Sequence, residues 1–422
     1  MSRRLRIGFV STRFAGTDGV SLEAAKWASV LEGLGHECFW FGGLLETPDE
    51  ISYLSEKAFF GHPSVIALQD DLFGSNRRSR EATRQIHALK EELKNDLYSF
   101  IEKFNIDVLI PQNILAIPMH LALGLAMTET IAETRTPTIA HHHDFAWERE
   151  RFINNAVPDL LATAFPPTFD AQPFHDVVIN TPAQRELARR RGLQSTVMPN
   201  VFDFDNPPAE PDAYSNGFRE DFGIADDETL VLQPTRVVPR KGIHHAIDLV
   251  SRLQADGRKV CLVISHDAGD EGMDYLDSLV QDADRAGIRM LCIGDRVGES
   301  RGVTDDGKKK YSLWDIFPHA DLVTYPSLYE GFGNAFLEAI YFRRPVFVNR
   351  YSIYISDIAP AGFKTIEMDG IVSSSHTEQV KQLLDSPSLQ KEWAEHNYQI
   401  GIEKFSHTLL RKKLSAILEA LN

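Results

Sequence analysis

The stretch from Tyr325 to Pro345, YPSLYEGFGNAFLEAIYFRRP, constrains the fold more than any other part of the chain. The apolar segment 322–325 predicts a short buried strand, and a loop with two glycines follows it. Asn334 stands where a helix N-cap is expected, and the pattern predicts a helix over about 335–343. A strand, a glycine loop and a helix N-terminus in succession bring backbone N–H groups toward an anion. The stretch therefore predicts an α/β domain with a phosphate site at the end of a strand.

Two carboxylates frame this loop. Glu330 precedes the glycines, and Glu338 lies one turn inside the predicted helix. Because carboxylates repel a phosphate, we expect them to bond hydroxyl groups of the same ligand. A phosphate site with two hydroxyl acceptors describes a sugar nucleotide better than ATP. The alternative is an ordinary helix cap beside two solvated glutamates.

The spacing Glu330-x7-Glu338 resembles the paired-glutamate motif of the retaining glycosyltransferases of family four, the group that includes glycogen synthase and sucrose-phosphate synthase. The family signature PS-x-x-E-G-F-G-x-x-x-x-E-A stands here as PSLYEGFGNAFLEA from Pro326 to Ala339. The resemblance implies the α/β GT-B fold, in which two Rossmann-like domains with parallel sheets face a central cleft.

A basic loop lies earlier in the chain. The strand expected at 229–233 is followed by PTRVVPRKG and then by a predicted helix. Two cations just before a helix N-terminus suit a diphosphate. Arg236 and Lys241 have the spacing of the family's diphosphate-binding pair. A solvated basic loop is the alternative.

The remaining donor contacts are implied by the resemblance alone. The loop after the strand at 290–293 is expected to contact the nucleotide base, and the glycine turn after the first strand is expected near the donor phosphates. An ordinary βα turn remains the alternative for that glycine turn. The expected donor-binding residues are Gly19, Arg236, Lys241, Gly294, Val297, Glu330, Gly331, Phe332, Gly333, Asn334, Ala335 and Glu338.

The length and the net charge of the chain limit the number of domains and the class of ligand. A chain of 422 residues is too long for one ordinary domain. The proline-rich acidic segment 205–215 is the best linker candidate. We therefore expect an N-terminal acceptor domain over 1–205 and a C-terminal donor domain over 206–403, with a last helix at about 404–422 that packs back onto the first domain.

The formal net charge of −16 excludes broad nucleic-acid binding, so an anionic ligand needs a local basic cluster.

The three cysteines, Cys38, Cys261 and Cys292, stand in apolar strand-like settings without metal-ligand spacing. Three buried thiols suit a reducing cytoplasm. The apolar run at 7–10 is too short for a signal peptide, and no run reaches the roughly 20 apolar residues that span a bilayer. We expect a cytoplasmic protein without stable membrane insertion.

The acceptor site is expected at strand ends of the first domain. Gln112 and Asn113 follow a strand at 107–111, where open α/β sheets place ligand contacts. The strand at 137–140 leads into three histidines and Asp144. Adjacent residues of an extended chain point to opposite sides, so the three histidines do not suit one metal ion.

By resemblance, His143 lies near the acceptor and the transferred sugar. The region 45–73 reads as irregular, and a basic patch follows it. That patch is either a solvated helix start or an anion site. The expected acceptor-binding residues are Arg77, Arg78, Gln112, Asn113, His143, Asp144, Arg149 and Arg151.

The resemblance implies a retaining transfer of a hexose, mannose or glucose, from a nucleotide diphosphate sugar. The expected catalytic group consists of His143, Arg236, Lys241 and Glu330. The cations stabilise the leaving diphosphate, so no metal is required and Mg²⁺ is at most a stimulator. Glu330 bonds the sugar hydroxyls and is not assigned as a nucleophile.

The acceptor is expected to be small, soluble and either phosphorylated or acidic. The stretch HHHDFAWERERF resembles enzymes that make compatible solutes, the mannosylglucosyl-3-phosphoglycerate synthases, which implies GDP-mannose as the donor. The alternatives are a UDP-glucose-dependent glucosyltransferase, a sugar-nucleotide-binding protein without activity, and a GT-B phosphorylase or epimerase, although no pyridoxal lysine can be located. A homodimer remains an alternative to a monomer.

Overall fold

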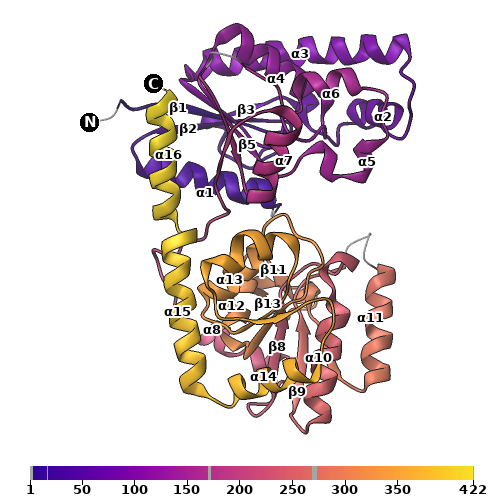
Figure 1. The fold of residues 1–422 in the computed structure, drawn as a ribbon, viewed down its shortest axis with the longest axis vertical. Coiled ribbons are helices and arrows are strands. Elements are labelled where there is room, and N and C mark those ends of the chain that lie inside the picture. The colour runs from indigo at the N-terminus through magenta and orange to yellow at the C-terminus, as the bar shows by residue number, and fades with distance from the viewer. Residues whose placement is uncertain (1–2, 17, 170–172, 269–272, 422) are drawn as a thin grey trace. The chain divides into compact units, whose positions relative to one another are not determined.

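The computed structural model describes residues 3–16, 18–169, 173–268 and 273–421. The chain divides into two compact units. Unit 1 is Met1–Val201 with His407–Asn422, and unit 2 is Phe202–Ser406. Each unit has a central parallel sheet with helices packed on it (Figure 1). Among the described residues, no helix has the length and apolar character needed to cross a bilayer.

The sheet of unit 1 has the order β3-β2-β1-β4-β5-β6-β7, with every described pair of neighbours parallel. Its strands are β1 (Arg6–Val10), β2 (Glu37–Gly42), β3 (Ser52–Leu54), β4 (Val108–Pro111), β5 (Thr138–His142), β6 (Phe174–Val178) and β7 (Ser195–Val197). The central strands β1 and β4 are almost wholly buried, because helices cover both faces of the sheet there.

The helices of unit 1 are α1 (Gly19–Gly33), α2 (Pro63–Leu72), α3 (Arg80–Phe104), α4 (Leu121–Thr134), α5 (Glu150–Ile153), α6 (Pro158–Ala164), α7 (Thr181–Arg191) and α16 (His407–Leu421). Ile7 and Phe9 pack in one cluster with α1 and α16. Val10 and Leu109 point to the other face, against α3 and α4. The last helix, α16, thus completes the core of unit 1, where it lies beside α1 (Figure 1).

The main sheet of unit 2 has the order β10-β9-β8-β14-β15-β16 and is parallel throughout its described pairs. Its strands are β8 (Thr229–Gln233), β9 (Val260–Ile264), β10 (Arg289–Cys292), β14 (Leu322–Tyr325), β15 (Val346–Asn349) and β16 (Ile366–Met368). A small second sheet contains β11 (Val297–Gly298), β12 (Gly302–Val303) and β13 (Lys309–Ser312).

The helices of unit 2 are α8 (Ala213–Asn216), α9 (Phe218–Asp221), α10 (Ile243–Ala255), α11 (Met273–Ala286), α12 (Leu313–Ile316), α13 (Asn334–Tyr341), α14 (Ser374–Leu384) and α15 (Pro387–Phe405). Residues of α10, α11 and α14 share one buried cluster with the strands. Helix α13 contacts β14, β15 and α15. The carboxyl ends of β8 and β14 are neighbours, so the loops that follow these two strands lie at the same end of the sheet.

Three expectations from the sequence are wrong. The region 45–73, read as irregular, contains the edge strand β3 and helix α2. Strand β5 continues through two of the histidines to His142, beyond the expected end at Ala140. Cys292 is exposed rather than buried, because it ends β10 at the edge of the sheet. The edge strand β3 has only three residues, and such a short element carries a weak hydrophobic pattern.

Candidate functional site

The basic loop and the glycine loop of unit 2 lie side by side because they follow the neighbouring strands β8 and β14. The backbone N–H of Leu328 donates to the carbonyl of Arg240 at 2.8 Å. Gly242, at φ 61°, permits this approach, since a Cβ there would lie 2.4 Å from the carbonyl oxygen of Pro326. The motifs at 236–241 and 326–338 therefore belong to one site.

A buried ion cluster joins the two loops. The carboxylate Oε1 of Glu330 accepts a hydrogen bond from the Lys241 ammonium, and Oε2 accepts one from Arg240 at 3.1 Å. The Lys241 and Glu330 side chains are nearly excluded from solvent, at 10% and 9% exposure. The Lys241 Nζ also lies 5.6 Å from the centre of the Tyr325 ring. Arg240 had no role in the sequence analysis, although it is the residue directly before Lys241.

The charges of this cluster stabilise one another. Burial alone would raise the pKa of the Glu330 carboxyl, but Lys241 and Arg240 outweigh it and hold that pKa below its ordinary value. Burial lowers the pKa of the Lys241 ammonium, and Glu330 opposes this change. Burial, with Glu330 beside it, raises the pKa of the Tyr325 hydroxyl. Glu330 is thus ionised at neutral pH and compensates two cations.

Arg236 lies in the loop after β8, at the same end of the sheet, and its side chain is exposed to solvent. Within the described part of the chain, its guanidinium has no carboxylate partner. His266 follows β9, the other neighbour of β8, and its pKa falls to about 4 through burial and the positive charges of Lys241 and Arg236. Arg236, Lys241 and His266 therefore share one neighbourhood with excess positive charge, and His266 is a residue that sequence reasoning missed.

The glycine loop differs from its prediction at the helix start. Gly333, not Asn334, is the N-cap of α13, and Asn334 is the first helical residue. Gly333 adopts φ 145°, and a Cβ there would lie 2.4 Å from the Tyr351 hydroxyl. That hydroxyl donates to the carbonyl of Phe332 at 2.8 Å and fixes the loop. Glu338 is half-buried on the second turn of α13.

The positions predicted to contact the nucleotide base follow β10. Gly294 is buried in a 3-10 turn (Gly294–Arg296), and Val297 begins β11. A Cβ on Gly294 would lie 2.1 Å from Oδ1 of Asp267, so the loop after β9 contacts the loop after β10 here. Contact of these residues with a base stays a prediction.

In unit 1, the residues predicted for the acceptor at the ends of β4 and β5 meet. The side chain of Asn113 accepts from the backbone N–H of His143 at 2.9 Å and donates to Asp144 at 2.7 Å. The amide oxygen of Gln112 lies 2.9 Å from Nδ1 of His141 and 3.1 Å from Nε2 of His143. Gln112, Asn113, His143 and Asp144 therefore form one network.

The three histidines alternate as a strand requires. His141 and His143 share Gln112, whereas Nε2 of His142 lies 2.8 Å from Asp176. Burial lowers the pKa of His143 to about 4, so it is neutral at pH 7. Burial also lowers the pKa of His141. No group of three His, Cys, Asp or Glu side chains in the described residues is arranged to hold a metal ion.

A pocket of about 160 Å³ opens beside Gln112 and Asn113, between the ends of β1 and β4. Its other lining residues are Ser11, Thr12, Arg13, Asp18, Val20, Phe60, Ile114, Ile117, Met119 and His120. Gly19, predicted near the donor phosphates, is the first residue of α1. Asp18 caps this helix, so its carboxylate lies at the α1 N-terminus.

None of the predicted arginines is among the described lining residues of this pocket. Arg78 makes two hydrogen bonds to Asp159, at 2.9 and 2.8 Å, and Arg77 is exposed. Arg149 pairs with Asp144. The Arg151 guanidinium lies 4.6 Å from the ring centre of Phe152 and contacts Met119. A role for these arginines in acceptor binding stays a prediction.

Two curated relatives decide the family. The chain is 34% identical to the mannosylglucosylglycerate synthase of Thermotoga maritima, over 97% of this chain and 99% of the relative. It is 32% identical to the mannosylglucosylglycerate synthase of Petrotoga mobilis, over 86% of each chain. The chain belongs to the mannosylglucosylglycerate synthase family. It is a glycosyltransferase. No protein-family model matches the sequence.

The structural comparison confirms the GT-B fold of this mannosylglucosylglycerate synthase-family chain. The crystal structure of a glycosyltransferase from Rickettsia africae matches 99% of this chain and 98% of its own, with a TM-score of 0.69 and 12% identity. At that identity the likeness concerns the fold alone. The predicted glycosyltransferase class and its relation to compatible-solute synthases are confirmed by the relatives.

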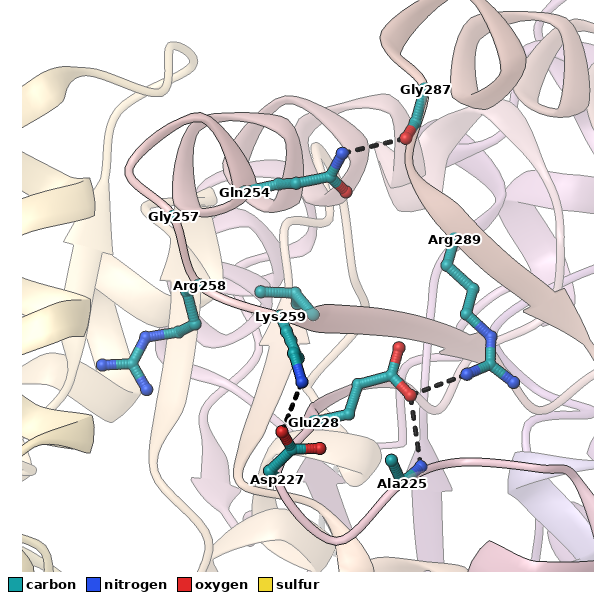
Figure 2. A pocket seen from close by; sticks show the side chains of 10 residues that line it. Ala225, Asp227, Glu228, Gln254, Gly257, Arg258, Lys259, Gly287 and Arg289 are labelled. Carbon is teal, nitrogen blue, oxygen red and sulfur yellow. Dashed lines mark hydrogen bonds and ion pairs between the residues drawn. The ribbon is translucent and has the colours of Figure 1, made fainter.

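A larger pocket of this synthase-family chain has a volume of about 480 Å³. It lies at the end of the unit 2 sheet opposite to the Lys241–Glu330 pair (Figure 2). Its residues precede or begin β8, β9 and β10, so it is at the amino ends of the strands. Its cations are paired: Lys259 with Asp227, Arg289 with Glu228 at 2.7 Å, and Arg258 with Asp385. It therefore lacks the unpaired positive charge found around Arg236.

Proposed function

We propose that this glycosyltransferase transfers mannose from GDP-mannose to glucosylglycerate, with retention at the anomeric carbon, and so forms mannosylglucosylglycerate. The names of the relatives support the product, which contains mannose, glucose and glycerate. This acceptor is an acid without phosphate, one of the two classes that the sequence leaves open. The observation that carries the proposal is the joint presence of Arg236, Lys241 and Glu330 at the carboxyl ends of β8 and β14.

The donor diphosphate lies against the loop amides at the start of α13 and the cations of the 236–241 loop. Negative charge grows on the diphosphate as the glycosidic bond breaks. Arg236 is placed to take up this charge, because its guanidinium has no carboxylate partner among the described residues. Lys241 adds a fixed charge. One lost electrostatic donor of this kind costs about 10²–10³-fold in turnover.

Glu330 has two tasks in this proposal. It orients the Lys241 side chain and opposes the lowering of the Lys241 pKa by burial, and its remaining lone pairs accept hydrogen bonds from hydroxyls of the transferred sugar. Glu338 accepts from the ribose hydroxyls. The leaving phosphate takes the proton of the acceptor hydroxyl on the face from which it departs, so no separate base is needed. His143, neutral at pH 7, acts as a hydrogen-bonding group toward the sugar and not as that base.

The experiment supplies glucosylglycerate with GDP-mannose, UDP-glucose or neither, and follows the product by NMR. The expected result is a new mannosyl anomeric proton with the α configuration of the donor, formed with GDP-mannose only. Inverted configuration contradicts the retaining mechanism, and transfer from UDP-glucose alone contradicts the donor. Nucleotide binding without transfer from any donor identifies a binding protein instead. Activity retained after EDTA treatment supports the role of the cations.

A further inference from the structure

The pocket in unit 1 contains one side chain with a permanent positive charge among its described lining residues, Arg13. His120 also lines it, but burial lowers the pKa of His120 to about 4, so it is neutral at pH 7. The pocket holds about 160 Å³. A cavity of about 150 Å³ takes up benzene, which is close in size to a glycerate group but much smaller than a disaccharide. Only one end of the proposed acceptor therefore fits.

The guanidinium of Arg13 is oriented with one edge open. Its Nε donates to Oδ2 of Asp18 at 3.2 Å, and its Cζ lies 5.3 Å from the ring centre of Phe60. Nη1 and Nη2 donate no hydrogen bond to any residue in the described ranges. The side chain is 35% exposed, so a ligand can reach it. Two parallel N–H donors are the arrangement that binds a carboxylate in bidentate fashion.

Asp18 holds Arg13 in this orientation and is itself fixed. Its Oδ1 accepts from the backbone N–H groups of Val20 and Ser21 at 3.0 and 3.3 Å, and its Oδ2 accepts from the Ser21 hydroxyl at 2.6 Å. The carboxylate also neutralises the positive end of α1. That helix end is therefore unsuited to a second anion, and Arg13 remains as the anion-binding group of the pocket.

A second donor lines the same pocket. Gln112 is fully buried, and its amide oxygen is occupied by the two histidines. Its amide nitrogen has no hydrogen-bond partner among the described residues. A buried amide N–H without a partner is costly, and an oxygen of a bound ligand removes that cost.

We infer that Arg13 binds the carboxylate of the acceptor's glycerate group in this pocket, with Asp18 as the positioning residue and Gln112 as a further hydrogen-bond donor. The inference rests on the proposed function for the identity of the acceptor. It assigns the selection of an acidic acceptor to Arg13 and Asp18 instead of to the arginines at 77, 78, 149 and 151.

The test compares glucosylglycerate with glucosylglycerol, which has a hydroxymethyl group in place of the carboxylate. For Arg13→Gln, the ratio of kcat/KM for the acid to that for the neutral analogue should fall about 10- to 100-fold, the loss of one or two charge-assisted hydrogen bonds. This fall should arise from a higher KM for the acid, with kcat little changed. Arg13→Lys keeps the charge without the fork and should restore part of the ratio. Asp18→Asn retains the helix cap and should lower the ratio less. Arg84→Gln, an exposed change on α3, is the control.

Calorimetry with glycerate alone, on the unmodified protein and on Arg13→Gln, separates the two proposals. If transfer to glucosylglycerate fails but glycerate binding depends on Arg13, the proposed function falls and the site remains. The inference is overturned if Arg13→Gln lowers kcat/KM by the same factor for both acceptors. It is also overturned if glycerate binds equally well to the unmodified protein and to Arg13→Gln. Tighter Arg13-dependent binding of inorganic phosphate than of glycerate also overturns the carboxylate assignment.

Discussion

Lys241 and Glu330 form a buried ion pair across two loops that are far apart in the sequence. The pair joins the ends of β8 and β14, so one interaction fixes both halves of the proposed diphosphate site. Glu330 therefore has a structural part in addition to its proposed contact with the sugar. Its charge also opposes the lowering of the Lys241 pKa that burial causes.

The first prediction concerns the stability of this pair. Lys241→Met leaves Arg240 as the only cation paired with Glu330 among the described residues, and the free energy of unfolding should fall by about 3–5 kcal/mol. The double variant Lys241→Met/Glu330→Leu replaces both charges with apolar groups and should recover part of that loss. Denaturant unfolding of the two single variants and the double variant gives the coupling energy. Strictly additive losses would show that the two charges do not interact.

The second prediction separates charge stabilisation from folding. Arg236 is exposed and has no carboxylate partner in the described structure, so Arg236→Gln should leave the melting temperature within about 1 °C, as for other surface changes. Turnover should fall by about 10²–10³-fold, with a smaller change in donor affinity. Steady-state kinetics and a thermal melt provide both measurements. Arg285→Gln, an exposed change on α11, is the control, and equal activity of the two variants would remove Arg236 from the mechanism.

The third prediction tests the backbone of the glycine loop. Gly333→Ala introduces a Cβ at φ 145° and within 2.4 Å of the Tyr351 hydroxyl. The free energy of unfolding should fall by about 1–3 kcal/mol, and donor binding should weaken because the loop amides move. Gly302→Ala is the matched control, since its Cβ meets no atom within 4 Å. A stable Gly333→Ala variant with unchanged donor affinity would contradict the proposed donor loop.

The fourth prediction is a pH dependence of stability in unit 1. Burial lowers the pKa of His120 to about 4, whereas the unfolded chain has the ordinary value of 6.5. The folded state then binds fewer protons, so the contribution of His120 is present above pH 6.5 and is lost as the pH falls toward 4. Between pH 6.5 and 5 the loss should approach about 2 kcal/mol.

His120→Asn keeps a side-chain acceptor at the start of α4, where His120 accepts the N–H of Leu123 at 3.2 Å. This variant should show a flatter stability curve from pH 5 to 7 in denaturant titrations. A curve as steep as that of the unmodified protein would show that other groups cause the acid sensitivity.

The sequence determined the fold class and the local elements of the proposed donor site. The segment from Pro326 to Glu338 has a strand, a glycine loop and a helix in a fixed order, and such local order follows from propensity and hydrophobic pattern. The same applies to the loop with Arg236 and Lys241. The start of α13 could not be placed to the residue, because Gly333 and Asn334 are both acceptable caps and only the contact with Tyr351 distinguishes them.

Tertiary structure alone decided which charges are neutralised. Arg78, Arg149 and Lys241 are all cations in the sequence, but only the fold shows that their carboxylate partners are Asp159, Asp144 and Glu330. Conversely, no sequence pattern indicated a role for Arg13. The fold places its guanidinium in the lining of a pocket that also contains Gln112. Periodicity reports which face of an element is buried. It does not report which strand lies beside which, and the charge balance of a site depends on that neighbour, since electrostatic energy falls with distance in space and not along the chain.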